Sequence, residues 1–208
     1  MLSDSKRIVV LASGDGSNLQ ALLDTGEEAL HATVAAVVTD RPAAGALQRA
    51  GAAGVPGAVV DPREHRDRSA WDALLLDRVA SFAPDLVVLA GFMRILGSAF
   101  PRRYPTLNVH PSLLPAFPGA HAVEDALAWG VKVTGCTVHL VDEQVDHGPI
   151  VAQEAVRILP GDTPATLHAR IQQVEHRLLP ECVSLFCRGV LSVDGRVVRQ
   201  RERRWRDA

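Results

Sequence analysis

Asn108 and His110 are the residues whose types and spacing point most directly to chemistry. They stand two apart in Thr106–His110, a run typical of a short β-strand, so their side chains should project from the same face. An amide can donate a hydrogen bond to the oxyanion that forms when a carbonyl is attacked, and an imidazole can move the proton. Pro111 follows at once and favours an extended exit from the strand. We therefore expect Asn108 and His110 to act together on a carbonyl carbon.

Asp146 is the candidate carboxylate for this pair. It stands in a turn between two strand-like runs, with Gly148-Pro149 behind it. A carboxylate beside the imidazole of His110 would favour the charged form of the ring and fix its tautomer. The alternative is structural, in which His110 only bonds a nearby carbonyl and Asp146 only caps a turn.

Two other chemistries find little support in the sequence. No GxSxG elbow is present, and Ser112 follows His110 too closely for an obvious serine–histidine pair. No HExxH or similar spacing joins the histidines, so we expect no metal. Four histidines could in principle converge: His110, His121, His139 and His147.

A glycine turn, Gly14–Leu19, follows the apolar run Ile8–Ala12 and precedes a helical pattern that Ser17 could cap. Backbone N–H groups and the helix dipole at such a turn favour an anion, so we expect a phosphate site. A dinucleotide site would need a third glycine where Leu19 stands, with Asp40 as the ribose-binding acid. We favour a monophosphate over a dinucleotide; a turn without a ligand is the third interpretation.

The elements that must position these residues alternate between strands and helices in the first half of the chain. This order predicts right-handed βαβ units, and hence a Rossmann-like α/β fold with a mostly parallel sheet flanked by helices. The expected strands are Ile8–Ala12, Val34–Thr39, Gly57–Asp61, Leu86–Ala90 and Thr106–His110, and the expected helices begin at Ser17 and cover Ala43–Ala53 and Arg66–Phe82.

The second half of the chain has a different pattern. Val131–Val141 and Ile150–Ile158 should pair antiparallel and extend the sheet. Thr163–Arg188 predicts a long helix, capped by Thr163 and kinked or interrupted near Pro180. Leu191–Val198 fits a hairpin with a turn at Asp194-Gly195. We expect a single domain over residues 1–208, of which residues 196–208 are a basic C-terminal tail.

Composition narrows the class of protein. The 208 residues are 47% hydrophobic and only 4% aromatic, which suits a sheet of Val, Leu and Ala and argues against stacked aromatic platforms for nucleic acid. The net charge of −2 favours neither nucleic acid nor a membrane. Three cysteines without paired spacing indicate a reducing compartment. No signal peptide or membrane-length apolar run is present, so we expect a soluble cytoplasmic protein.

With these motifs in place, the chain resembles the folate-dependent formyltransferase family over roughly Ile8 to Phe186. The residues that carry the resemblance are Ser13–Leu19, Val88–Leu96, Asn108–Pro115, Pro118–His121, Asp146–Ile150 and Val174–His176. Several formyltransferases share the segment around Asn108 and His110, whereas the glycine loop and the compact length favour the branch that acts in purine (IMP) biosynthesis. The resemblance implies transfer of a formyl group from 10-formyltetrahydrofolate to the amine of 5′-phosphoribosylglycinamide, by direct amine attack through a tetrahedral intermediate.

The resemblance also implies roles for individual residues. Oxyanion stabilisation and proton transfer fall to Asn108, His110 and Asp146. The ribonucleotide substrate would be held by Gly16, Ser17, Asn18, Leu19 and Glu175. The folate co-substrate would be bound by Arg68, Met93, Arg94, Ile95, Leu96, Asn108, Val141, Asp142 and Asp146.

Two departures from the family pattern carry expectations of their own. Asp15 stands where the family commonly has Asn, so its carboxylate should face away from a bound phosphate. The turn Asp142–Val145 is one residue longer than in some relatives, which puts the register of the folate contacts there in doubt but leaves Asp146 anchored by Gly148-Pro149.

Other activities stay open at this point. Methionyl-tRNA formyltransferase and formyltetrahydrofolate deformylase carry a further domain and are disfavoured by length, and a sugar-nucleotide N-formyltransferase fits the Ser17-Asn18 loop less well. The non-enzyme alternative is a dinucleotide- or RNA-binding module, the latter using the six arginines of residues 196–208. The expected partners are small-molecule substrates, with a homodimer as a further expectation and neither membrane nor nucleic acid.

Overall fold

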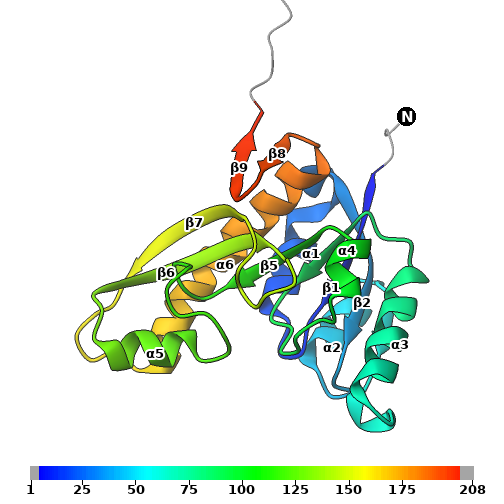
Figure 1. Cartoon of the computed structure of the whole chain (residues 1–208), viewed down its shortest axis with the longest axis horizontal. Coiled ribbons are helices and arrows are strands. Elements are labelled where there is room, and N and C mark those ends of the chain that lie inside the picture. The colour runs from blue at the N-terminus through cyan, green and yellow to red at the C-terminus, as the bar shows by residue number, and fades with distance from the viewer. Residues whose placement is uncertain (1–4, 202–208) are drawn as a thin grey trace, which may run out of the picture.

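A computed structural model describes residues 5–201 of the chain. Its centre is a nine-stranded sheet in the order β3-β2-β1-β4-β5-β6-β7-β9-β8 (Figure 1). The strands are β1 (Lys6–Leu11), β2 (Ala32–Thr39), β3 (Gly57–Val59), β4 (Leu86–Leu89), β5 (Thr106–His110), β6 (Val133–Leu140), β7 (Ile150–Arg157), β8 (Leu191–Asp194) and β9 (Val197–Gln200).

The direction of the strands changes along the sheet as the sequence predicts. Strands β3, β2, β1, β4 and β5 are parallel, whereas β6 runs antiparallel to β5 and β7 antiparallel to β6. The α/β class, the mostly parallel sheet and its antiparallel C-terminal extension are therefore confirmed. The chain winds to β2 and β3 on one side of β1 and to β4 and β5 on the other, and such a switch point is where open α/β sheets bind ligands.

Helices cover both faces of the sheet. They are α1 (Ser17–Leu30), α2 (Gly45–Ala52), α3 (Arg68–Ala80), α4 (Ala99–Arg103), α5 (Ala122–Trp129) and α6 (Pro164–Cys187), with a short 3₁₀ turn η1 at Pro62–Glu64. The sequence reasoning did not assign α4 and α5. Within the described residues, no helix is long and apolar enough to cross a membrane.

The alternation of β1 side chains divides the core into two layers. Ile8 and Val10 pack with Leu19 of α1 and Leu167 of α6, together with residues of α2 and α5. Val9, with Leu11, packs on the other face with α3 and α4. Successive residues of a buried parallel strand serve opposite faces, so a continuous apolar run is what this position requires.

The long C-terminal helix differs from expectation at its proline. Thr163 caps α6 as predicted, since its hydroxyl accepts from the Thr166 N–H. Of the two alternatives expected at Pro180, a kink or an interruption, the interruption is wrong, because α6 runs from Pro164 to Cys187 with that proline inside it. Leu178, Leu179 and Pro180 are all buried, and packing against the sheet holds the helix where the missing N–H weakens it.

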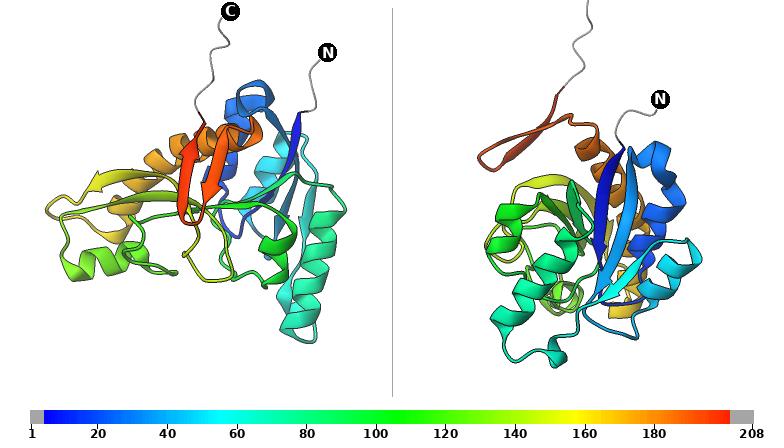
Figure 2. Two further views of the ribbon diagram at one scale, coloured as in Figure 1. Left: turned by 45° about the horizontal axis from the view of Figure 1, so that its top comes forward. Right: turned by 90° about the vertical axis from the view of Figure 1, so that its right-hand side faces the viewer.

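The C-terminal hairpin was predicted at Leu191–Val198 and is present as β8 and β9, which meet at Gly195 (Figure 2). A single residue pair, Ile150 with Val197, joins β9 to the edge of β7. Val197–Gln200 is therefore a strand rather than part of a tail. Residues 202–208 of the expected basic tail lie outside the described residues, so the suggested RNA contact stays untested.

Candidate active site

The structure brings Asn108, His110 and Asp146 together at the carboxyl end of β5. Asn108 Nδ2 lies 3.3 Å from Asp146 Oδ1, and His110 Nδ1 lies 3.5 Å from Asp146 Oδ2. Asp146 reaches this position from the turn between β6 and β7, which folds back over the end of β5. A Cβ at Gly148 would sit 1.8 Å from the carbonyl oxygen of Leu140, so that turn can close only over glycine.

Asp146 is charged in the folded protein. Burial alone raises the pKa of its carboxyl group, but the His139 ring, the neighbouring His110 and the Gly119 N–H outweigh burial and hold that pKa below its usual range. The Gly119 N–H donates to Asp146 Oδ2 at 2.7 Å. A carboxylate that is ionised and nearly buried provides a strong local field for the imidazole beside it.

Both ring nitrogens of His110 face an acceptor. Nδ1 faces Asp146, and Nε2 donates to the carbonyl oxygen of Phe117 at 2.8 Å. Acceptors on both sides of the ring fix its orientation. Asp146 and Phe117 also have positive φ angles of 51° and 53°, and backbone of this kind in non-glycine residues concentrates at functional sites.

A second histidine, His139, belongs to the same cluster and was not predicted as a site residue. Its Nε2 lies 3.1 Å from Asn108 Nδ2 and 3.6 Å from Asp146 Oδ1, while its Nδ1 donates to the carbonyl of Leu140. Both amide protons of Asn108 are therefore engaged by neighbouring side chains. To donate to a substrate oxygen, Asn108 must break its longer hydrogen bond, the one to Asp146. The signal for His139 lies in the β5–β6 register, which pairs it with Asn108 and becomes visible only after folding.

The exit from β5 is held by side chains of the two antiparallel strands. The Ser112 hydroxyl is buried and donates to the carbonyl of Ala116, which agrees with its exclusion as a nucleophile. Thr137 donates to the carbonyl of Ser112 and accepts from the Leu114 N–H. Gln153 donates to the carbonyl of Leu114 and to Thr137. These contacts fix the loop that leads away from His110.

The glycine turn adopts the conformation that an anion site needs. Gly16, with φ of 81°, is the N-cap of α1, so the expectation that Ser17 caps the helix is wrong and Ser17 is its first residue. A Cβ at Gly16 would lie 2.7 Å from the Cα of Ala46, which only glycine avoids. Leu19 is buried in the core, so only its backbone can face a ligand. Asp15 points outward to Arg49 at 2.7 Å with 75% of its side chain exposed, as expected.

Asn18 and Glu175 meet across the interior, from α1 and α6. Asn18 Nδ2 donates to Glu175 Oε2 at 2.8 Å, and both side chains are buried. One proton of the Asn18 side-chain amide is therefore engaged by Glu175. Asn18 Oδ1 is buried without a hydrogen-bond partner among the described residues. The contact links the glycine turn to the acidic group expected to bind the same substrate.

Arg49 lies beside this turn and was also missed by sequence reasoning. Its guanidinium donates to the carbonyl of Asp15, and it lines a shallow surface pocket with Ser17 and His176. No local pattern in the sequence marks this arginine, because only the packing of α2 against α1 places it there.

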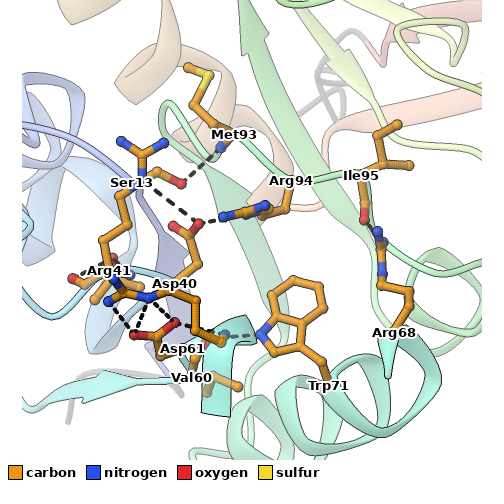
Figure 3. Close-up of polar contacts among 12 residues, drawn as sticks. Ser13, Asp40, Arg41, Val60, Asp61, Arg68, Trp71, Met93, Arg94 and Ile95 are labelled. Carbon is orange, nitrogen blue, oxygen red and sulfur yellow. Dashed lines mark hydrogen bonds and ion pairs between the residues drawn. The ribbon is translucent and has the colours of Figure 1, made fainter. Parts of the chain in front are cut away.

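The expected folate loop, residues 92–96, connects β4 to α4. Met93 and Ile95 expose 60% and 63% of their surface, which is unusual for large apolar side chains and suits an apolar ring. Arg68 donates to the carbonyl of Ile95 (Figure 3). It also pairs with Asp72. Leu96 packs against the core layer beneath α3. The structure therefore links Arg68 to this loop, as the predicted set requires.

The predicted residues of the longer turn divide into two groups. The Val141 N–H donates to the carbonyl of Thr106, and its side chain packs on the core, so it is anchored to β5. Asp142 turns toward His147, whose Nδ1 lies 2.7 Å from its carboxylate. Burial opposes ionisation of Asp142, but His147 and the Gln144 N–H outweigh it and lower the pKa of this carboxyl group. Its side chain is therefore bound within the turn rather than joined to Asp146.

Within residues 5–201, no group of three or more His, Cys, Asp or Glu side chains is arranged to hold a metal ion. His110 and His139 both approach Asp146, but His147 pairs with Asp142 and His121 stands at the start of α5. The four histidines that could have converged do not do so.

Fold and site together define an α/β enzyme with an amide, an imidazole and a carboxylate placed to act on a carbonyl carbon. Residues 6–183 match the model of the formyl transferase family. The chain is 52% identical over 192 residues to a phosphoribosylglycinamide formyltransferase of Mycobacterium tuberculosis, covering 91% of this chain and 89% of that protein. A protein of the same name from Bacillus subtilis is 40% identical over 181 residues, covering 86% and 93%.

A solved structure agrees with these relatives. The crystal structure of glycinamide ribonucleotide transformylase 1 from Symbiobacterium toebii superposes with a TM-score of 0.92 at 48% identity, covering 95% of this chain and 94% of that one. The chain belongs to the formyl transferase family.

Proposed function

We propose that Asn108, His110 and Asp146 catalyse formyl transfer from a formyl-folate to the amine of 5′-phosphoribosylglycinamide. The chain matches proteins named phosphoribosylglycinamide formyltransferase over most of its length, at 52% and 40% identity. This similarity gives the activity itself, which belongs to purine biosynthesis. The observation that carries the catalytic assignment is the buried contact of Asp146 with both Asn108 and His110. We place this activity in one domain formed by the whole chain.

The chemistry needs two services from these side chains. As the amine attacks the formyl carbon, the carbonyl oxygen gains negative charge, and Asn108 with the protonated His110 would donate hydrogen bonds to it. The bond from the formyl carbon to the donor nitrogen then breaks as that nitrogen takes a proton from His110. The proton that the attacking amine loses passes to His110, so the ring ends in its starting state. Asp146 stabilises the imidazole while it is charged. Because the amine attacks directly, no nucleophilic side chain is required.

His110 must exchange one partner for this role. Its Nε2 proton is held by the carbonyl of Phe117, at 2.8 Å. A formyl oxygen that replaces this carbonyl would find a donor already oriented by the contact of Nδ1 with Asp146.

The acceptor phosphate would lie at Gly16–Leu19, where the first N–H groups of α1 have no partners within the helix. Ser17 adds a hydroxyl, and Glu175 lies within reach of the same substrate through its contact with Asn18. A carboxylate at Glu175 suits the hydroxyls or the amine of the acceptor rather than its phosphate.

The donor, 10-formyltetrahydrofolate, would lie along residues 92–96 and the turn that carries Val141, Asp142 and Asp146. The exposed side chains of Met93 and Ile95 fit a flat apolar ring. Arg68 leaves about half of its side chain exposed beside the loop, which suits a carboxylate of a folate tail, whereas the Arg94 guanidinium is paired with Asp40.

The test is turnover by the purified chain. We expect 10-formyltetrahydrofolate to be consumed only when 5′-phosphoribosylglycinamide is present, with one formylated product formed per donor lost. Consumption without the acceptor would indicate a deformylase, and consumption with an amino sugar nucleotide in its place would redirect the acceptor assignment. His110→Ala should lower kcat by at least about 100-fold. Near-normal kcat in that folded variant would overturn the catalytic assignment.

A further inference from the structure

Asp40 stands directly after β2 and carries a carboxylate with no role in the site described so far. Its side chain is completely buried. Arg94 Nε donates to Asp40 Oδ2 at 2.7 Å, and Arg41 Nε lies 3.9 Å from the same oxygen (Figure 3). Asp40 Oδ1 has no hydrogen-bond partner among the described residues. Arg94 is therefore the main compensation for a buried negative charge.

Arg94 belongs to the loop at residues 92–96, which is anchored by side chains at three consecutive residues. The Met93 N–H donates to the hydroxyl of Ser13 at 2.8 Å, and Arg68 donates to the carbonyl of Ile95. Between these two contacts, the Arg94 side chain reaches Asp40 (Figure 3). The anchors come from the segments after β1 and β2 and from the start of α3, three separate parts of the chain.

The contact between Arg94 and Asp40 differs from the other two anchors because it is an ion pair with a buried carboxylate. Ser13 and Arg68 hold backbone atoms of the loop and would hold them for many side chains at positions 93 and 95. The Asp40 contact instead fixes the one charged side chain of the loop, and a buried carboxylate strongly resists the loss of its cation. Arg94 thus has one favoured position, which restricts the backbone that exposes Met93 and Ile95.

We propose that Asp40 is a positioning residue for the folate loop: by holding Arg94, it keeps residues 92–96 in the conformation that binds the formyl donor. This inference rests on the proposed function, since it takes that loop as the donor site. It gives Asp40 a task different from the ribose contact of a dinucleotide site. It also predicts an effect on the donor alone, because Asp40 contacts neither the glycine turn nor the Asn108–His110–Asp146 cluster in any hydrogen bond of the described residues.

The first test is Asp40→Ala, with KM and kcat measured separately for each substrate. We expect KM for 10-formyltetrahydrofolate to rise about tenfold, the scale of one lost charged hydrogen bond, with kcat and the acceptor KM within about twofold. Asp40→Asn keeps an oxygen that can accept from Arg94 Nε and fits the same space. Asp40→Asn should therefore retain most of the donor affinity. If Asp40 had a purely structural role, the rise in donor KM of each variant would instead parallel its loss of thermal stability.

A double-mutant cycle with Arg94→Ala tests whether Asp40 acts through that side chain. If it does, D40A/R94A should bind the donor no worse than R94A alone. R94A should also melt below the double variant, because it leaves Asp40 buried without its cation. Asp162→Asn is the matched control, since Asp162 is also a buried carboxylate held by an arginine, Arg170, but stands before α6 and away from the loop.

The outcomes distinguish failure of the proposed formyl transfer from failure of the positioning role of Asp40. A wild-type chain that does not transfer the formyl group contradicts the proposed function itself. An active wild type, with D40A normal in donor KM, overturns the role of Asp40. The role is also overturned if the effects of D40A and R94A on donor KM are additive, or if D162N raises donor KM as D40A does. If D40A does not fold, the isosteric D40N carries the test, with a smaller rise of about threefold expected in donor KM alone.

Discussion

Replacing Asp146 with asparagine is the sharpest perturbation of the site, because it changes charge and almost nothing else. The carboxylate accepts from the Gly119 N–H at 2.7 Å and lies 3.5 Å from His110 Nδ1 and 3.6 Å from His139 Nε2. Asparagine keeps the shape but has one acceptor oxygen for the Gly119 N–H and His110 Nδ1, since His139 Nε2 accepts from Asn108. Its NH₂ group must then face a donor, either Asn108 or the Gly119 N–H.

The magnitude follows from the distance and the burial. Two unit charges 3.5 Å apart attract by about 1 kcal/mol in bulk water and by about 5 kcal/mol at an effective dielectric constant of 20. The side chains of His110 and Asp146 are only 6% and 10% exposed, so the higher figure is the better guide. If about 3 kcal/mol of it supports the charged imidazole in the transition state, its loss lowers kcat about 100-fold.

The assay is steady-state turnover with both substrates saturating, together with circular dichroism to verify the fold. Asp194→Asn is a suitable control because it removes an exposed carboxylate from the β8–β9 hairpin, and it should leave kcat unchanged. A D146N enzyme with kcat within about threefold of wild type would refute the electrostatic role of Asp146. It would also show that shape and hydrogen bonding alone orient His110.

Three further predictions concern the framework. Gly16→Ala should lower the free energy of unfolding by about 2 kcal/mol and weaken binding of the phosphorylated acceptor, because a Cβ there is strained and meets the backbone of α2. Urea unfolding measures the first effect, and an unchanged urea midpoint would contradict the clash. Arg196 donates to the carbonyl of His147 at 2.7 Å, so Arg196→Ala should loosen the turn that carries Asp146 and lower kcat a few-fold, with thermal stability almost unchanged. A wild-type kcat would show that the hairpin does not support the turn. Arg63 holds the pKa of Asp61 at about 2. The stability that Asp61 contributes is therefore complete above its ordinary pKa near 4 and is lost as the pH falls from about 4 to about 2. Acid unfolding curves of D61N should lack this loss of stability, and curves identical to those of the wild type would contradict the role of Asp61.

Much of the site could be predicted because its signals are local. The spacing of Asn108 and His110 on a strand fixes their common direction, and both reach the same cluster. Glycine at position 16 before a helical pattern likewise predicted the turn, whatever the rest of the chain does. Such features depend on backbone geometry over a few residues, which the sequence states directly.

The errors arose where distant packing outweighs local preference. Pro180 favours a break in a helix, but the buried face of α6 keeps the helix continuous. Glu175 was expected at the substrate site, but its partner was not, since only the packing of α6 against α1 buries it beside Asn18. Asp40 could be placed at a strand end but not paired, since its arginine lies 54 residues further along the chain.

By itself, the sequence determined the order of the strands and of the helices α1, α2, α3 and α6, the glycine turn and the shared face of Asn108 and His110. These features depend on periodicity and on the backbone freedom of single residues. The tertiary structure alone decided which charges meet. The β5–β6 register places His139 against Asn108, and the turn before β7 brings Asp146 to both. Such pairings depend on strand register and on the closure of long loops, whose energy is set by the whole core.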